Sequence, residues 1–177
     1  LTQISENGID NVMALRGDIP QDGIVCHDYT HASDLVADIR SQAPDICIGG
    51  ACYPEGHIES PNKNLDIDYL KLKVDAGCDF LTTQMFFDNN IFYNFLYRIK
   101  DKGITVPVLP GVMPVTTARQ LSRSVALSGT NVPERFRAIV DKFGSDPDAM
   151  RRAGIIYASE QIIDLIANGV NHIHVYS

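Results

Sequence analysis

The sequence predicts an α/β fold built around a parallel β-sheet. Strand-like runs alternate with helical segments about five times along the 177 residues, and the crossovers between them are roughly 20 to 35 residues long, as βαβ units require. The strand-like runs are nearly continuous apolar stretches, which is typical of parallel strands covered on both faces. No linker or low-complexity segment interrupts this alternation, so we expect a single domain over residues 1–177.

Two architectures fit the alternation of strands and helices. One is an open, doubly wound sheet. The other is a (β/α)₈ barrel, which needs eight strands and about 250 residues. The glycine-rich fingerprint GxGxxG does not follow any expected strand, and neither a P-loop nor a GxSxG motif is present. The pattern alone leaves both architectures open.

Three strands are expected in the first half of the chain, at residues 11–15, 45–52 and 80–83. Each is rich in apolar or β-branched residues and is followed by polar or turn-forming residues. Ser33 is expected to cap the helix after the first strand, because serine accepts a hydrogen bond from a first-turn N–H. Asp66 is expected to open the helix after the second strand.

The second half of the chain is expected to add strands at 106–109, ending in Pro110-Gly111, and at 172–176. Its helix starts are marked by capping side chains or a first-turn proline, and we place them at Asp88, at Thr116 or Thr117, near Pro133, and at Asp146-Pro147. The apolar positions in register on the last helix predict its buried face: Ile155, Ala158, Ile162 and Leu165.

Composition and charge exclude several classes of protein. Hydrophobic residues make up 45% of the chain and charged residues 21%, which is ordinary for a globular domain. The net charge of -7 and a pI near 5.1 argue against nucleic-acid binding, which needs a basic surface. No apolar run is long enough to span a bilayer. We therefore expect neither nucleic-acid nor membrane partners.

The four cysteines indicate a reducing, cytoplasmic location. Cys26, Cys47, Cys52 and Cys78 form no CxxC pair, and no histidine lies at a zinc-finger spacing from them. His172 and His174 alternate on the last expected strand, but no third ligand accompanies them. We expect no metal site.

Polar side chains follow three of the expected strands. These groups are Arg16 with Asp18, then Tyr53 with Glu55 and His57, and then Gln84. Because parallel strands end at the same edge of a sheet, their convergence predicts a ligand site there.

Two nearby features each have two interpretations. Phe86-Phe87 beside Gln84 either stack on a flat ligand or pack at the start of the next helix. Lys71 and Lys73 either meet a phosphate or face solvent.

Taken together, these motifs resemble the methylenetetrahydrofolate reductase family. The matching pieces run in family order along nearly the whole chain: Ala14-Leu15-Arg16-Gly17-Asp18, Ala32-Ser33-Asp34-Leu35-Val36, Tyr53-Pro54-Glu55 with His57, Lys73-Val74-Asp75-Ala76-Gly77, Thr83-Gln84-Met85-Phe86-Phe87-Asp88, Pro110-Gly111-Val112-Met113-Pro114-Val115, and Gly169-Val170 with His172 to Tyr176. Each piece alone is weak, and the ordered combination is highly specific.

The resemblance implies an FAD-binding TIM (β/α)₈ barrel, of which this chain corresponds to roughly the last five βα units. On that basis we expect the chain to be an incomplete barrel that lacks its N-terminal strands and is inactive in isolation. The implied reaction is reduction of 5,10-methylenetetrahydrofolate to 5-methyltetrahydrofolate, a step of one-carbon metabolism that feeds methionine biosynthesis. FAD is the implied cofactor, and NADH or NADPH the implied electron donor.

The resemblance also assigns roles to individual residues. Asp18 is the implied catalytic residue, placed near the flavin and the folate pterin, where a carboxylate disfavours anionic reduced flavin. The implied cofactor-binding residues are Arg16, Gly17, Asp18, His31, Ala32, Tyr53, His57, Asp66 and Lys73. The implied substrate-binding residues are Asp18, Gln84, Phe86 and Gln120. His31 stands where many members have tyrosine.

Two other functions remain as alternatives. A proline dehydrogenase-like enzyme would share the barrel and the use of FAD. The other alternative is an inert fragment that acts as an interaction module, because the resemblance implies that the family's glutamate general acid lies on the first three strands, which this chain lacks. An open five-stranded sheet would expose two edges, which natural proteins avoid, so we expect a homo-oligomer. Some relatives work with an electron-transfer partner subunit, which is a second implied source of electrons.

Overall fold

The computed structural model describes residues 2–17 and 28–177. Its larger sheet has the order β1-β2-β3-β4 and is parallel throughout. The strands are β1 (Asn11–Ala14), β2 (Cys47–Cys52), β3 (Phe80–Thr83) and β4 (Val108–Leu109). A second parallel pair joins β5 (Gly111–Val112) to β6 (His174–Val175). The prediction of an α/β fold with a parallel sheet is confirmed.

Pro110 alone separates β4 from β5, so one extended segment pairs with β3 on one side and with β6 on the other. Proline has no N–H to donate, which interrupts the ladder at this point. Next to this interruption, the Thr83 hydroxyl joins β3 to β5 by accepting the Gly111 N–H at 2.8 Å. The expected strand at 106–109 therefore continues past Pro110-Gly111, where the sequence predicted its end.

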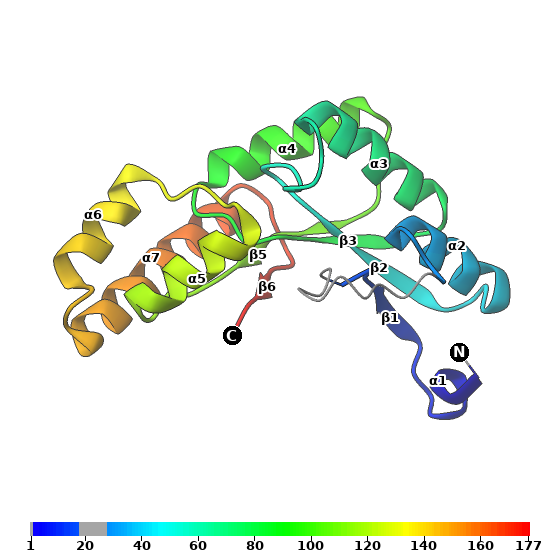
Figure 1. Cartoon of the computed structure of the whole chain (residues 1–177), viewed down its shortest axis with the longest axis horizontal. Helices are drawn as coiled ribbons and strands as arrows, with labels where there is room; N and C mark the ends of the chain where they lie inside the picture. The colour runs from blue at the N-terminus through cyan, green and yellow to red at the C-terminus, as the bar shows by residue number, and fades with distance from the viewer. Residues whose placement is uncertain (1, 18–27) are drawn as a thin grey trace.

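Helices follow β1, β2, β3 and β5, and Figure 1 shows α2, α3 and α4 along one side of the larger sheet. The first four helices are α1 (Thr2–Glu6), α2 (Ala32–Gln42), α3 (Lys63–Asp75) and α4 (Asn89–Asp101). The other three, which gather at the end of the molecule that holds β5 and β6, are α5 (Ala118–Ser128), α6 (Glu134–Phe143) and α7 (Pro147–Ala167).

Two predicted helix starts are wrong. α2 begins after His31, not Ser33, and the His31 backbone N–H donates to the Asp34 carboxylate at 2.9 Å. α3 begins after Asn62, whose side chain accepts from two first-turn N–H groups. Asp66 therefore lies inside the first turn of α3, where a carboxylate is favoured by the helix dipole.

The predicted starts at Asp88, Thr117 and Asp146 are confirmed, because each side chain accepts from a first-turn N–H. α6 follows Pro133, also as expected. Strand β3 has its predicted bounds. The other strands are shorter than predicted by one to three residues, which is the usual uncertainty at an element's end.

The hydrophobic core lies between the sheet and its helices. Ile48 and Ala14 pack with Val36 of α2, and Leu81 packs with Phe95 of α4. On β1 the alternate residue Met13 is 43% exposed, as expected if it points to the opposite face of the sheet.

The buried face of α7 differs from the predicted one. Ala158 and Leu165 are buried as expected, whereas Ile155 is 44% exposed. Gly154 and Gln161 are buried instead. A Cβ on Gly154 would lie 1.7 Å from the Val115 carbonyl oxygen, so the missing side chain lets α7 approach the segment after β5.

This close approach predicts that Gly154→Ala destabilises the protein although alanine favours helix. We expect the free energy of unfolding to fall by about 2 kcal/mol, since backbone cannot move aside cheaply. That corresponds to a Tm lower by about 4–8 °C for a chain of this size. The control is Ser159→Ala on the exposed side of α7, with a change of about 0.5 kcal/mol or less. A Gly154→Ala protein as stable as the wild type in thermal unfolding would contradict the packing described.

Candidate functional site

The carboxyl ends of neighbouring strands are tied together. At the end of β3, the Gln84 N–H donates to the Cys52 carbonyl of β2 at 2.7 Å. After β1, the two terminal nitrogens of Arg16 contact the two carboxylate oxygens of Glu59 at 2.9 and 2.8 Å, and Glu59 lies in the loop after β2. The predicted convergence of Arg16, Gln84 and the loop after β2 is therefore present at this edge.

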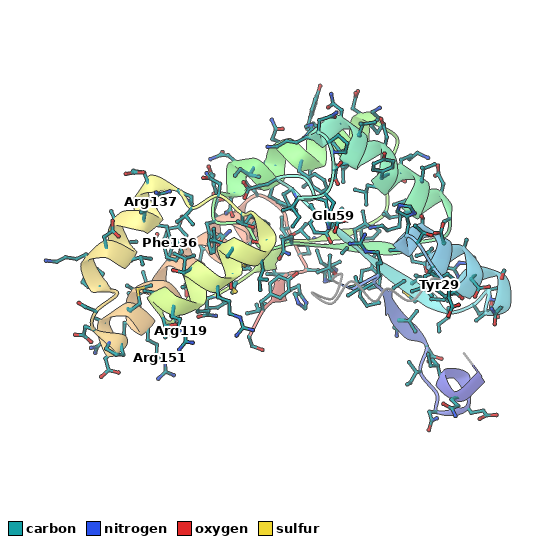
Figure 2. The ribbon with its side chains drawn as sticks, in the orientation of Figure 1. Tyr29, Glu59, Arg119, Phe136, Arg137 and Arg151 are labelled. Carbon is teal, nitrogen blue, oxygen red and sulfur yellow. The ribbon has the colours of Figure 1, made fainter. Side chains whose placement is uncertain are left out.

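Glu59 is a carboxylate at this edge that forms an ion pair with Arg16. The Arg16 guanidinium holds the pKa of the Glu59 carboxyl below its usual value, and His57 and His31 contribute in the same direction. Arg16, which the family resemblance assigns to the cofactor, is thus paired directly with this carboxylate. Figure 2 shows Glu59 near the middle of the molecule, far from Arg151 at the α6–α7 end.

His57 is held in one orientation by its own loop. Its Nδ1 accepts the Glu59 backbone N–H at 3.1 Å. A neutral imidazole that accepts at Nδ1 carries its proton on Nε2, which leaves Nε2–H as a donor. The Tyr53 ring meets the His57 ring edge-on, with centroids 4.5 Å apart. Together these contacts form a donor and an aromatic surface at the end of β2.

Asp66 and Lys73 extend this group along α3. Burial raises the pKa of the Asp66 carboxyl, while a hydrogen bond from the His57 backbone opposes the shift. Burial likewise lowers the pKa of Lys73, whose Nζ donates to the Ala51 carbonyl at 2.7 Å. The structure places Lys73 between α3 and β2, in contact with the sheet, rather than on the solvated helix face that was its alternative.

The remaining predicted cofactor residues lie on the chain before α2. Gly17 has φ +79, a left-handed conformation that favours glycine, and a Cβ there would meet no described atom within 4 Å. Ala32 is the first residue of α2. Asp18, the predicted catalytic residue, lies outside the residues that the structure describes, as does Cys26.

One of the two polar atoms of the Gln84 side-chain amide makes a hydrogen bond to the backbone. Its Oε1 accepts the N–H of the following residue, Met85, at 2.9 Å. This contact folds the amide oxygen back onto its own backbone, so the Nε2 hydrogens are the donors that this amide can offer. The arrangement suits recognition of a ligand acceptor at the end of β3.

Of the other two predicted substrate residues, Phe86 belongs to the core, whereas the substrate role of Gln120 stays a prediction. Phe86 is fully buried and stacks on Phe92 of α4, with centroids 5.3 Å apart and planes 1° from parallel. Phe86 therefore packs at the start of α4, which is the second of its two interpretations, and it is not a ligand contact. Gln120, in the first turn of α5, turns its Oε1 toward the Thr116 N–H at 2.9 Å.

The sequence missed two residues that shape this edge. Glu59 looked like one of several polar loop residues, and the contact with Arg16 spans 43 positions. Tyr176 follows β6, and its hydroxyl donates to the Thr83 carbonyl at 2.8 Å. Local sequence gives no signal for either contact, because both partners come from distant segments.

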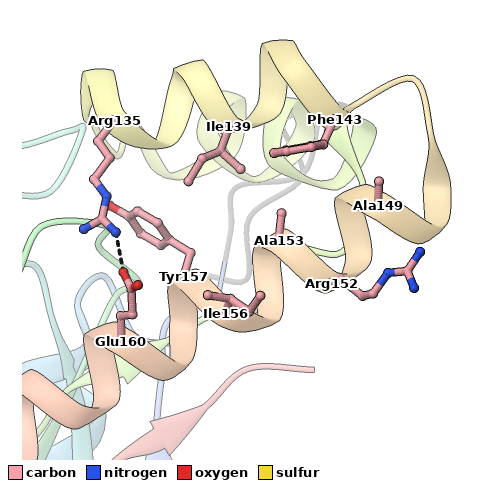
Figure 3. A pocket seen from close by; sticks show the side chains of 9 residues that line it. All are labelled: Arg135, Ile139, Phe143, Ala149, Arg152, Ala153, Ile156, Tyr157 and Glu160. Carbon is pink, nitrogen blue, oxygen red and sulfur yellow. Dashed lines mark hydrogen bonds and ion pairs between the residues drawn. The ribbon is translucent and has the colours of Figure 1, made fainter.

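A separate hollow lies away from this edge. It is a groove of about 410 Å³ between α6 and α7, bordered by the Arg135–Glu160 ion pair and floored by apolar side chains such as Ile139 and Ile156 (Figure 3). Over the described ranges 2–17 and 28–177, no acidic, cysteine and histidine side chains cluster as metal ligands, and no helix is long and apolar enough to cross a membrane. Cys47, Cys52 and Cys78 are free thiols.

A solved structure with a similar fold is that of an uncharacterised Clostridium thermocellum protein that binds two copies of 5-methyl-5,6,7,8-tetrahydrofolic acid. The similarity covers 81% of this chain and 50% of that one, with a TM-score of 0.53 and 18% sequence identity. At this identity the comparison establishes a shared fold alone.

Sequence comparison gives the family. The chain is 38% identical to methylenetetrahydrofolate reductase 2 of Saccharomyces cerevisiae, with 97% of this chain and 30% of the yeast protein covered. It is 34% identical to 5,10-methylenetetrahydrofolate reductase of Pectobacterium carotovorum, with 97% of this chain and 57% of that protein covered. The chain thus spans under a third of the yeast relative. The family model for methylenetetrahydrofolate reductase matches residues 1–177, and the chain belongs to this family.

Proposed function

We propose that the protein containing this chain reduces 5,10-methylenetetrahydrofolate to 5-methyltetrahydrofolate, with FAD as its cofactor and NADH or NADPH as the donor. The observation that carries the proposal is the group Arg16, Glu59, His57 and Asp66, which joins the ends of β1 and β2 to the start of α3. Related proteins carry NADH in their names in Arabidopsis thaliana and NADPH in Caenorhabditis elegans.

We further propose that the sheet is part of a (β/α)₈ barrel. The strand order β1-β2-β3-β4, continued through β5 to β6, never reverses. Right-handed crossovers in such a sheet put all the helices on one side. A doubly wound sheet, in contrast, reverses its order at a switch point and has helices on both faces. Strand order therefore supports the barrel over the other architecture that the sequence left open.

The chemistry of several described residues is compatible with a bound flavin. Bound FAD would supply hydride transfer between nicotinamide and folate. No described atom lies within 4 Å of the place that a Cβ would take on Gly17, a neutral His57 would donate from Nε2, and the Tyr53 ring lies beside it. Arg16 would bring a fixed positive charge to the same edge. Gln84 would donate to the folate from Nε2. Because the chain belongs to the methylenetetrahydrofolate reductase family, a folate is favoured over the substrate of a proline dehydrogenase-like enzyme.

The proposed reaction can be tested directly on the purified, complete protein. We expect FAD-dependent conversion of 5,10-methylenetetrahydrofolate with NADH or NADPH, followed by the appearance of 5-methyltetrahydrofolate. Asp18→Asn should lower kcat/KM for the folate about 10- to 100-fold, since it removes a charged hydrogen-bonding group. Unchanged folate reduction by Asp18→Asn would remove its assigned role. A complete protein that binds FAD but turns over no folate would sink the proposed function.

His57 gives a separate prediction about the cofactor. His57→Ala should weaken FAD binding about fivefold, because one hydrogen bond contributes about 1 kcal/mol. His57→Gln should recover part of that affinity, since glutamine can place an N–H where Nε2–H was. The control is His172→Ala, an exposed histidine before β6, which should leave FAD affinity within about twofold. Flavin fluorescence titration measures all three, and equal affinities for the His57 and His172 variants would contradict the assignment.

A further inference from the structure

Side chains from other elements hold the backbone that carries Gln84. Four of the five carbonyl groups from Thr83 to Phe87 each accept a side-chain hydrogen bond. The donors are Tyr176 to Thr83 at 2.8 Å, Thr130 to Met85 at 3.2 Å, Gln161 to Phe86 at 2.8 Å, and Tyr157 to Phe87 at 2.7 Å. The turn from β3 into α4 is thus fixed by residues that lie 45 to 93 positions away in sequence.

Gln161 is the most enclosed of these donors on α7. Its side chain is 7% exposed, and its Nε2 donates to the Phe86 carbonyl in the protein interior. Its own backbone carbonyl accepts from Asn89 Nδ2 at 2.9 Å, at the start of α4. Residue 161 therefore contacts the connection between Gln84 and α4 at the Phe86 carbonyl and contacts the first residue of α4, Asn89.

A buried glutamine in an otherwise apolar helix face needs a physical reason. The neighbours of Gln161 on that face are Met150, Ala158 and Leu165, and an apolar side chain would pack there without desolvation cost. Such a side chain would leave the Phe86 carbonyl buried and unpaired, which costs more than the hydrogen bond itself contributes. Gln161 therefore stabilises one conformation of the turn.

Tyr157 acts beside Gln161. The two residues are four positions apart, so they lie on the same face of α7 and reach successive carbonyls, those of Phe87 and Phe86. Two donors on one rigid helix fix both the position and the direction of the turn. Gln84 lies two residues before Phe86, so the position of its side chain depends on the position of this turn.

We propose that Gln161 is a positioning residue for the substrate: it fixes the turn after β3 so that Gln84 presents its amide to the folate. The inference rests on the proposed function. Gln161 itself is too deeply enclosed to be a contact residue, and it acts through the backbone of Phe86. Loss of the donor should loosen the turn and raise KM for the folate, because small displacements of a positioning group are costly.

The first experiment compares Gln161→Leu with the wild type in the complete protein. We expect KM for 5,10-methylenetetrahydrofolate to rise about tenfold, with FAD affinity within about twofold of the wild type. The control is Ile99→Val, a core substitution near the far end of α4 that also lowers Tm. Ile99→Val should leave KM unchanged, which separates positioning from loss of stability. A Gln161→Leu protein with the wild-type KM would overturn the proposal.

The second experiment asks whether Gln161 acts through Gln84. In a Gln84→Ala background, Gln161→Leu should change KM by less than about twofold, because the group that it positions is gone. A full additional tenfold effect in that background would overturn the proposal.

Hydrogen exchange tests the same inference without any turnover. Backbone amides of residues 84–88 should exchange faster in Gln161→Leu than in Ile99→Val at matched distance from Tm. A wild-type protein without folate reduction would refute the proposed function, and equal exchange in the two variants would refute the positioning role.

Discussion

The carboxyl end of β3 is the joint on which the rest of the structure depends. Thr83 accepts the Gly111 N–H with its hydroxyl and the Tyr176 hydroxyl with its carbonyl, while the next residue, Gln84, donates to Cys52 of β2. Three strands beyond β3 itself are thereby fixed at one point. Because Pro110 cannot donate, the ladder would be broken here without the Thr83 hydroxyl.

Buried and half-buried polar groups in this half of the molecule each have a partner that offsets their desolvation. Lys73 donates to a carbonyl of β2, Gln161 donates to the turn after β3, and Asp66 accepts from the backbone of His57. Buried polar groups specify one arrangement because moving them leaves donors or acceptors unpaired.

Much of the fold could be read from local chemistry. Asp88, Thr117 and Asp146 cap their helices as expected, and β3 has its predicted bounds. The failures have a common cause. Ser33 and Asp66 are good capping residues by type, yet His31 and Asn62 hold the extended backbone that precedes each helix. On α7, hydrophobic periodicity selected Ile155, whereas the position that meets the sheet layer requires Gly154.

The sequence by itself determined the alternation of strands and helices, the gathering of Arg16, His57 and Gln84 at one edge, and the resemblance to a family. Hydrophobic periodicity, helix capping and strand ends depend on residues that are close together in the sequence, so they can be predicted from it. The tertiary structure decided that Glu59 pairs with Arg16, that Phe86 belongs to the core, and that Gln161 supports the turn beside Gln84. Each of these depends on which distant segments meet, because a side chain's role is set by the groups it contacts after folding.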